Sequence, residues 1–419
     1  WDTLKERDYL RKLLLTPFAK TKKKLVLVTI DKIGSAPAPK SPVYIQLEKY
    51  FADKKKPNDF SKNLLKPFVK EKTLDAALFK AIKKIDNRME NNQEFVEIKN
   101  TDYIKDNWSE YQSSTSLESL IPHPLDYVLD TYVAFKSNAL DQLNDLSTTK
   151  GKVAHKVIQL LFSPKKEEKD SGTPAYIRTQ MDKHFDEIFE DTVQSEGAIL
   201  LTKDNKLELQ QFKKQLSASL EGLLKGISEN KLHVVACEKS VGYQQEKDSD
   251  KVIRHGFIGE LDTKGFIDMQ LEDPEGNPYI FDFKWTTSDR HSQKLKENKS
   301  IQLALYKELI EQETKRKVKA AAYYLLPLAR FVSISDLKGA INLSHILTES
   351  ERASKDLLKE IQNSYKYRKE EILSGKLEET ADWAKEDITY EQKRDDLDLL
   401  PMDYYDNAKT GTYNPIAVI

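Results

Sequence analysis

Residues 265 to 285 read G-F-I-D-M-Q-L-E-D-P-E-G-N-P-Y-I-F-D-F-K-W, and this stretch predicts the centre of the fold. From position 279 to position 285 the residues alternate strictly: odd positions are aromatic, and even positions are Ile280, Asp282 and Lys284. A period of two is typical of a β-strand, and the aromatic face would pack on a core. The opposite face carries a carboxylate and an ammonium, where a strand covered on both sides would carry more apolar residues. This polar pair marks a candidate site.

The residues before this strand predict a hairpin. Asp273 to Pro278, D-P-E-G-N-P, is rich in the residues that favour chain reversal. This turn would join a strand at 266–272 to the strand at 279–285. The turn length predicts that Glu272 pairs with Tyr279.

This pairing predicts a metal site. It places Asp268 roughly opposite Asp282 and Phe283, so two carboxylates and the Lys284 ammonium converge on one part of the sheet. Carboxylates that close repel each other unless a cation lies between them, and oxygen ligands suit Mg²⁺ or Mn²⁺. A second G-x-x-D, which ends at Asp262, is an alternative source of the first carboxylate. At about 3.3 Å per residue it lies roughly 20 Å along the strand from Asp268, so both cannot serve one ion, and the hairpin favours Asp268.

The order G-x-x-D, hairpin, D-x-K resembles the PD-(D/E)XK nucleases, and in particular their RecB/AddB-type branch. A lone D-x-K triplet is common in charged sequences, whereas five elements in the right order are specific. The resemblance covers roughly residues 112 to 335. The three other elements are 151–155 (G-K-V-A-H), which resembles the upstream G-x-x-x-H motif, Glu238 in H-V-V-A-C-E-K-S-V, which resembles an additional acidic position, and 302–306 (Q-L-A-L-Y), which resembles the Q-x-x-x-Y helix after the hairpin.

The resemblance implies a role for each matching residue. Lys284 would orient or deprotonate the attacking water and offset charge on the phosphorane. Gln302 and Tyr306 would steady Lys284 or a substrate phosphate. Beside two carboxylates Lys284 should stay charged, which favours electrostatic assistance over strict general-base catalysis. The ligands of Mg²⁺ or Mn²⁺ would be Asp268, Asp282, the carbonyl of Phe283, His155 and Glu238.

Each element also has a purely structural explanation. Asp282 and Lys284 fit a solvated ion pair on an edge strand, worth about 0–1 kcal/mol, although their flanks are too apolar for an edge. His155 fits a satisfied core histidine, because it lies off the polar stripe of its predicted helix at 152–162. Glu238 fits a structural ion pair equally well. Gln302 and Tyr306 lie one helical turn apart, as polar pairs on surface helices often do.

The composition restricts the class of protein. The chain has 419 residues, enough for two or three domains, and no run of 18 apolar residues, so we expect no membrane span. It starts at Trp1 rather than methionine, which predicts a piece of a longer chain. Residues 1–72 carry 18 Lys and Arg against 8 Asp and Glu, and residues 378–419 carry 4 against 11. The basic N-terminal part would be a solvated face or a nonspecific phosphate contact.

The cysteine count excludes several kinds of site. Cys237 is the single cysteine, so a disulfide framework and a cysteine-based zinc site are excluded within the chain. It is compatible with a reducing compartment, and we expect a cytoplasmic protein. Many AddB-type nuclease domains hold an iron–sulfur cluster through four cysteines, one of which corresponds to His123 here. We therefore expect no iron–sulfur cluster.

We predict an α/β fold: a restriction-endonuclease-like core, with a mixed central sheet flanked by helices, and extra helical regions. Strands are expected within 232–285 and at 318–325. The expected domains are the end of an upstream helicase-like module (1–45, with a helix at 2–15 and a strand at 25–30), a helical connector (46–111), the nuclease domain (112–375) and an acidic tail (376–419). Helices are expected at 116–139, 152–162, 174–195, 207–230, 293–312 and 349–375.

The predicted function is a divalent-metal-dependent DNA nuclease, of exonuclease type. The resemblance places it in a helicase–nuclease of recombination and DNA repair, with DNA ends as substrate and a helicase subunit as a further partner. The chain has no G-x-x-x-x-G-K-[ST] motif, so a motor would come from elsewhere. The first alternative is a catalytically silent nuclease-like scaffold that binds DNA or a helicase. The second is a helical interaction protein in which these motifs are coincidental.

Overall fold

The computed structural model describes residues 32–33, 36–37, 95–98, 101–133 without 110, 146–245 without 166, 169, 203 and 204, 252–378 and 389–401. The chain divides into two units, Trp1–Asn91 and Asn92–Ile419. In the first unit, β1 (Lys32–Ile33) pairs with β2 (Ala36–Pro37). The helix predicted at 2–15, the strand at 25–30 and residues 46–94 of the predicted connector lie outside the described residues.

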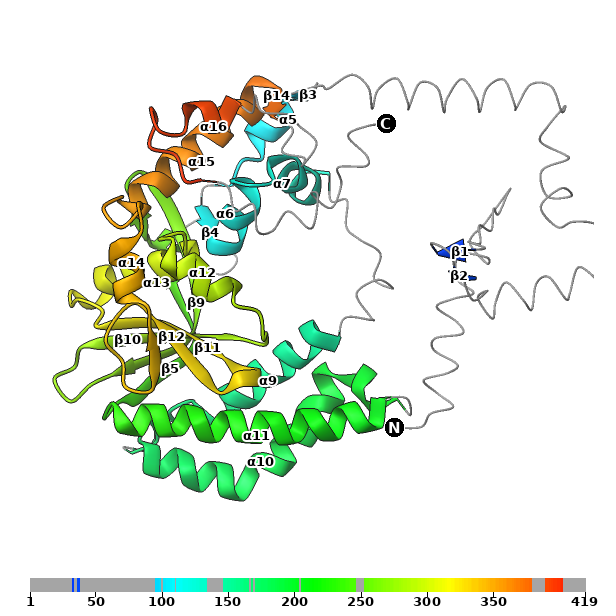
Figure 1. Ribbon diagram of the computed structural model, residues 1–419, viewed down its shortest axis with the longest axis vertical. Helices are drawn as coiled ribbons and strands as arrows, with labels where there is room; N and C mark the ends of the chain where they lie inside the picture. Colours follow the sequence, from blue (N-terminus) through cyan, green and yellow to red (C-terminus); the bar gives the residue numbers. More distant parts are fainter. Residues whose placement is uncertain are drawn as a thin grey trace, which may run out of the picture. The chain divides into compact units, whose positions relative to one another are not determined.

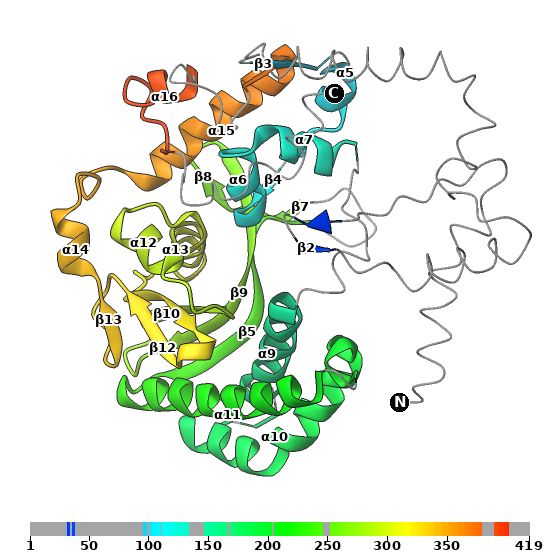
Figure 2. The same ribbon diagram turned by 45° about the vertical axis from the view of Figure 1, so that its right-hand side comes forward.

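The second unit is built on a mixed sheet of eight strands within the described residues. Its strands follow the order β13-β12-β11-β10-β9-β4, and β5 and β8 also pair with β9. Their bounds are β4 (Tyr111–Ser113), β5 (His233–Gly242), β8 (Phe257–Ile258), β9 (Leu261–Glu272), β10 (Pro278–Lys284), β11 (Ala320–Leu325), β12 (Arg330–Ser333) and β13 (Ala340–Asn342). Figure 2 shows β5 and β9 running side by side through the middle of this unit. The predicted mixed central sheet is confirmed.

Helices cover both faces of the sheet. One face, which packs in a single apolar cluster with Phe281 and Phe283, carries α9 (Leu146–Phe162), α10 (Pro174–Glu196) and α11 (Lys206–Glu229). The other face, which packs around Ile267 and Ile280, carries α6 (Ser114–Leu120), α7 (Pro124–Thr131), α13 (Ile301–Thr314) and α15 (Leu357–Ser374). Figure 1 shows α10 and α11 at one end of this unit and α15 at the other. The alternating residues of β10 therefore serve two separate cores, as its period of two predicts.

Shorter elements complete the second unit. None of the helices in the described part of the chain has both the length and the apolar character needed to span a lipid bilayer. The remaining elements are β3 (Phe95–Glu97), which pairs with β14 (Lys376–Glu378), β6 (Gln244–Gln245), which pairs with β7 (Val252–Arg254), and α5 (Thr101–Asp106), α12 (Arg290–Lys296), α14 (Ser344–Glu349) and α16 (Thr389–Lys393).

Local sequence explains the long helices of the first face. Thr173 precedes α10 and accepts a hydrogen bond from the Tyr176 amide, and Pro174 occupies the first turn. Along α11, apolar residues recur every three or four positions, which gives the helix one buried stripe. That stripe consists of Phe212, Leu216, Leu220, Leu223, Leu224 and Ile227. The helices predicted at 174–195 and 207–230 are confirmed to within one residue at each end.

Three other predicted helices are interrupted. The helix predicted at 116–139 is broken between α6 and α7, because Pro124 starts a new helix in its first turn. The helix predicted at 293–312 is broken between α12 and α13, where Asn298 adopts a left-handed φ of 52°. The region 349–375 contains the end of α14 and then α15, which starts after the N-cap Asp356 and ends at Gly375. Short non-helical segments therefore interrupt each of these predicted helices.

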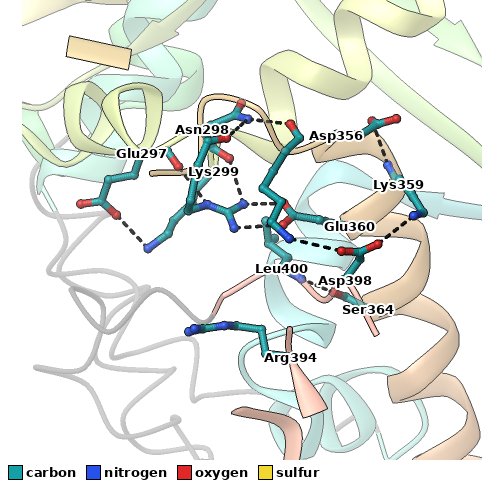
Figure 3. Close-up of polar contacts among 12 residues, drawn as sticks. Glu297, Asn298, Lys299, Asp356, Lys359, Glu360, Ser364, Arg394, Asp398 and Leu400 are labelled. Atoms are coloured by element: carbon teal, nitrogen blue, oxygen red, sulfur yellow. Dashed lines mark hydrogen bonds and ion pairs between the residues drawn. The ribbon is translucent and has the colours of Figure 1, made fainter. Parts of the chain in front are cut away.

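The loop between α12 and α13 is fixed to the residues that precede α15, and α15 contacts the C-terminal segment. The Arg352 guanidinium pairs with Glu360 and donates to the carbonyl of Glu297. Lys359 at the start of α15 lies 2.7 Å from Asp398 (Figure 3). Leu400 donates its amide to Ser364 over 2.8 Å (Figure 3). These contacts connect the loop before α13 to α15 and α15 to the segment after α16.

The hairpin forms as predicted, but its register differs by one residue. Glu272 pairs with Pro278 and not with Tyr279, which pairs with Leu271. Asp273 determines the register, because its side chain accepts from the Asn277 amide and its carbonyl accepts from Gly276, which has a φ of 78°. A turn closed in this way is one residue shorter than the sequence pattern predicted.

The sheet opens where β9 passes from one neighbour to the next. β5 occupies one edge of β9 from Lys264 to Glu272. On the other edge, β4 pairs with 262–264 and β10 pairs with 269–272. On this edge positions 265–268 have no ladder partner among the described residues. β10 continues beside β11 as far as Lys284, so its last residues lie next to this opening.

Candidate active site

Asp282 and Lys284 form a buried ion pair beside the opening in the sheet. Asp282 is 1% exposed, and Lys284 Nζ lies 2.7 Å from its Oδ2. Despite this proximity, neither carboxylate oxygen of Asp282 has a hydrogen bond of acceptable geometry to a described residue. A buried carboxylate with unfilled acceptor positions is costly unless a further cation balances it.

Burial and charge act together on Asp282. Burial raises the pKa of the Asp282 carboxyl, and the charge of Asp268 raises it further, to about 7, although Lys284 acts in the opposite direction. Burial alone would lower the pKa of Lys284, but Asp282 and Asp268 raise it, so the ammonium stays charged at neutral pH. The single positive charge of Lys284 therefore does not balance the two carboxylates of Asp282 and Asp268.

Asp268 occupies the opening itself. Its side chain is 11% exposed, and its Oδ2 accepts the Phe283 amide over 2.6 Å, in place of a ladder hydrogen bond between β9 and β10. This contact brings the carboxylate of one hairpin strand against the backbone of the other. The hairpin therefore places Asp268 beside the D-x-K segment.

His155 on α9 faces the same carboxylates from across the cleft. Its Nδ1 lies 3.4 Å from Asp268 Oδ1 and 3.6 Å from Glu238 Oε1. Its Nε2 lies 3.1 Å from the Phe283 carbonyl. Burial lowers the pKa of His155, but the hydrogen bond and charge of Asp268 outweigh it and raise the pKa to about 10. His155 is therefore protonated at neutral pH, and its positive charge stabilises the carboxylates of Asp268 and Glu238.

The two ring nitrogens of His155 have different partners. Nε2–H donates to the Phe283 carbonyl, and in the imidazolium Nδ1–H points toward Asp268 and Glu238. Displacement of the Nδ1 proton by a cation would leave a lone pair directed at the same place. A histidine held in this way is oriented to act as a metal ligand. The Phe283 carbonyl, a predicted metal ligand, contacts His155 Nε2 in this structure.

Glu238 reaches the cluster through an unusual backbone conformation. It lies in β5 between the pairs Cys237–Met269 and Lys239–Ile267, which places it next to Asp268 on β9. Its φ is 51°, in the left-handed region that residues other than glycine seldom adopt. Strained residues of this kind cluster at functional sites, where the surrounding structure holds them.

A chain of hydrogen bonds from α13 holds the Lys284 ammonium in place. Lys284 Nζ donates to Gln302 Oε1 over 2.9 Å, and Gln302 Nε2 donates to the Tyr306 hydroxyl over 3.2 Å. The Tyr306 hydroxyl lies 3.5 Å from Ser114 Oγ at the start of α6. Gln302 and Tyr306 are one turn apart on α13, so one helix face fixes the position of the ammonium.

The cluster opens into a cleft of about 1050 Å³. The cleft also contains residues that the sequence did not single out as site residues. Lys152 and Lys156 were expected only as the polar stripe of a helix, and no sequence signal distinguished Phe266. The lining residues are Thr115, Ser147, Thr148, Gly151, Lys152, His155, Lys156, Gln159, Glu196, Glu238, Phe266, Phe283, Lys284 and Trp285.

Asp262, the alternative carboxylate, lies elsewhere on β9. Its Oδ1 accepts the Gly256 amide over 2.8 Å, and its Oδ2 pairs with His255. It lines a separate pocket with Trp108 and Lys366. The structure thus brings Asp268, and not Asp262, next to Asp282.

The donor atoms fit a divalent cation. His155, Glu238 and Asp268 offer three ligand atoms that all lie within 4.8 Å of one another. Neighbouring ligands of an octahedral ion with bonds of about 2.1 Å lie roughly 3 Å apart, which small side-chain movements reach from the spacings here. Asp282 is not part of this group of three, and its Oδ2 lies 2.7 Å from Lys284 Nζ. Carboxylate and imidazole donors suit Mg²⁺ and Mn²⁺.

Comparison with known proteins agrees with this geometry. The family model described as the PD-(D/E)XK nuclease superfamily matches residues 112–386. This span includes every residue of the cluster and more than half of the 419-residue chain. No curated protein matches the chain.

Proposed function

The chain belongs to the PD-(D/E)XK nuclease superfamily, and from that premise we propose that it hydrolyses DNA phosphodiester bonds in the cleft between α9 and the β9–β10 hairpin. The superfamily consists in general of metal-dependent phosphodiesterase nucleases, and the mixed sheet flanked by helices is its restriction-endonuclease-like fold. The observation that carries the proposal is Asp282, a buried carboxylate that is ion-paired with Lys284 and has no other polar partner within hydrogen-bond geometry among the described residues, beside Asp268.

We assign the metal-holding role to the carboxylates of Asp268 and Asp282, together with His155 and Glu238. The Phe283 carbonyl remains a predicted ligand. A divalent ion supplies two things that hydrolysis needs at neutral pH: a stronger nucleophile from water and stabilisation of the negative charge that develops on the phosphate.

Lys284 acts in this proposal as an ammonium. Its raised pKa keeps it protonated, so it orients water and offsets charge rather than removing a proton. Gln302 and Tyr306 act through Lys284, because they hold its Nζ at the edge of the cluster. A group held by neighbours before substrate arrives needs no reorganisation during the reaction.

The finer assignments rest on the order of the motifs. The segment 151–155 and the pair Gln302 and Tyr306 follow the RecB/AddB-type pattern. Gly151, Lys152 and His155 line the cleft, and Gln302 and Tyr306 are connected to it through Lys284. We therefore propose an exonuclease of recombination and repair that acts on DNA ends beside a helicase subunit in the cytoplasm. The residues 1–45 are proposed as the end of a helicase-like module, 46–111 as a connector, 112–375 as the nuclease domain and 376–419 as an acidic tail.

The test is digestion of end-labelled linear single-stranded and double-stranded DNA and of a closed circle, with Mg²⁺, Mn²⁺ or EDTA. Lys284→Ala should lower metal-dependent cleavage by about 100-fold or more, the effect typical of losing a preorganised charge at a reaction centre. Lys239→Ala is the matched control, because Lys239 is another ion-paired lysine of the sheet, with 25% side-chain exposure against 24% for Lys284. An untouched circle would support the exonuclease assignment.

The same assay separates the alternatives. DNA binding and metal binding without cleavage would favour a silent scaffold. Cleavage that is equally strong in EDTA, or unchanged by Lys284→Ala, would refute the proposed site.

A further inference from the structure

Phe266 is an apolar ring exposed at the mouth of the cleft. It is 56% exposed, more than Phe257 at 46% or Tyr103 at 51%, while its neighbour Ile267 is fully buried. A single exposed apolar side chain is ordinary on a protein surface. Phe266 differs because it lines the same cleft as Glu238 and His155.

The position of Phe266 on β9 relates it to the candidate metal ligands. It lies two residues before Asp268, so both side chains point to the same side of the strand, about 7 Å apart along it. A base next to a phosphate at the carboxylates is therefore within reach of Phe266, and it can stack on the ring when no neighbouring base covers that face.

The opposite wall of the cleft supplies positive charge. Lys152 and Lys156 are exposed, lie one turn apart on α9 and line the cleft together with His155. Lys156 donates to Gln159 on its own helix, and Glu196 is an acidic residue of the same lining. An aromatic ring on one wall and lysines on the other are the combination by which proteins bind single-stranded nucleic acid.

We propose that the cleft binds single-stranded DNA, with one base stacked on the Phe266 ring and the adjoining phosphates against Lys152 and Lys156. This inference rests on the proposed nuclease function and defines its substrate as a single strand. A duplex does not fit the same contacts, because the faces of its bases are covered by their neighbours. Phe266 is a binding residue in this proposal, and the candidate metal ligands are not required for its contact with the base.

The experiment measures binding apart from cleavage. Fluorescence anisotropy of labelled DNA is recorded with the full chain in EDTA. The probes are an oligothymidylate, an abasic strand of equal length, and a blunt duplex. Phe266→Ala removes the ring, and Phe266→Trp keeps an aromatic face. Phe257→Ala is the matched control, because Phe257 is another exposed phenylalanine of the sheet, stacked on His255 outside the cleft.

The expected result is specific to the base. Phe266→Ala should weaken oligothymidylate binding by at least about 5-fold, the lower end of what one lost stack costs, and should leave binding of the abasic strand unchanged. Phe266→Trp and Phe257→Ala should bind both strands as the parent chain does. Equal losses on both strands, no loss on the oligothymidylate, or tighter binding of the duplex than of the single strand would each overturn the proposal.

Failure of the two proposals can be told apart. Base-dependent binding that requires Phe266, without any metal-dependent cleavage, would uphold the single-strand site and refute the nuclease. Metal-dependent cleavage with unchanged oligothymidylate binding in Phe266→Ala would uphold the nuclease and refute the single-strand site.

Discussion

Gly265 on β9 lies directly against the ring of Tyr306 on α13: a Cβ added to Gly265 would be 2.4 Å from Tyr306 Cε1. The close approach is possible because glycine has no side chain. This contact joins β9, which carries Asp268, to α13, which holds Lys284 through Gln302. The support of the ammonium therefore depends on a residue that has no side chain.

Gly265→Ala should displace the Tyr306 ring and loosen the hydrogen bonds from Tyr306 through Gln302 to Lys284. Overpacking of this kind costs about 1–3 kcal/mol of stability, and we expect metal-dependent cleavage to fall by about 10-fold, the factor that ~1.4 kcal/mol represents. Urea unfolding and cleavage rates measure the two effects. In a Tyr306→Leu background the same substitution should cost less stability. An equal cost in both backgrounds would show that the ring is not the obstacle.

Asp282→Asn should have opposite effects with and without metal. In EDTA the change removes the repulsion between Asp282 and Asp268 and the burial cost of the charge, so the thermal midpoint should rise by about 1–2 °C for each kcal/mol gained in a unit of this length. In the parent chain Mg²⁺ at 100 times its dissociation constant should add about 2.7 kcal/mol, and the variant should lose this increment. Differential scanning calorimetry with and without Mg²⁺ tests both. A variant that is stabilised by Mg²⁺ as strongly as the parent would remove Asp282 from the metal site.

Glu238 should show the cost of its left-handed backbone when Gly and Ala variants are compared. Both variants lose the carboxylate, so both should bind Mn²⁺ more weakly by a similar factor. Glu238→Gly should nevertheless be more stable than Glu238→Ala by about 1 kcal/mol, because glycine adopts a positive φ without steric cost. Chemical denaturation gives the stability difference and calorimetric titration the metal affinity. If the alanine variant were the more stable one, the strain at this position would be disproved.

His291 should make the fold sensitive to acid. Its imidazole packs on Tyr323, and burial together with the charges of Lys284, Lys294 and Arg290 lowers its pKa to about 3. Between its ordinary pKa of about 6.5 and pH 3 the unfolded chain binds a proton that the folded chain does not. Stability should therefore fall as the pH drops through this window, by up to about 1.4 kcal/mol per unit.

The variant His291→Phe should remove this contribution. Free energies of unfolding from urea titrations between pH 4 and pH 8 should then have a shallower slope below pH 6.5. His345→Gln, at an imidazole with 80% side-chain exposure, is the matched control. Identical slopes for His291→Phe and the parent would mean that His291 is not the acid-sensitive group.

Much of the site follows from local sequence. The period of two in 279–285 predicts the two faces of β10, and Asp273 to Pro278 predicts the turn, because both depend on residues next to one another. The D-x-K spacing likewise directs Asp282 and Lys284 to one side of the strand. Helices α10 and α11 follow from their apolar stripes and from the cap at Thr173.

The hairpin register and the helix breaks were predicted less well. Pairing shifted by one residue because the Asp273 side chain closes the turn earlier than strand alternation indicates. The break at Asn298 depends on one left-handed residue, which has no periodic signal. A shift of a turn or a helix end by one residue changes the free energy of folding only slightly. A hydrophobic pattern that extends over many residues therefore does not predict it.

The amino-acid sequence is sufficient to predict the hairpin, the polar pair Asp282 and Lys284 on β10, and the packing of β10 against two cores. These features depend on residues close together in the chain and on the alternation of side chains along a strand. Tertiary packing alone brings α9 across the sheet, so that His155 meets Glu238 and Asp268 although they lie far apart in the sequence. It also opens β9 between β4 and β10 and leaves Phe266 exposed there. Contacts of this kind depend on which distant surfaces pack together, and neither residue spacing nor periodicity encodes that choice.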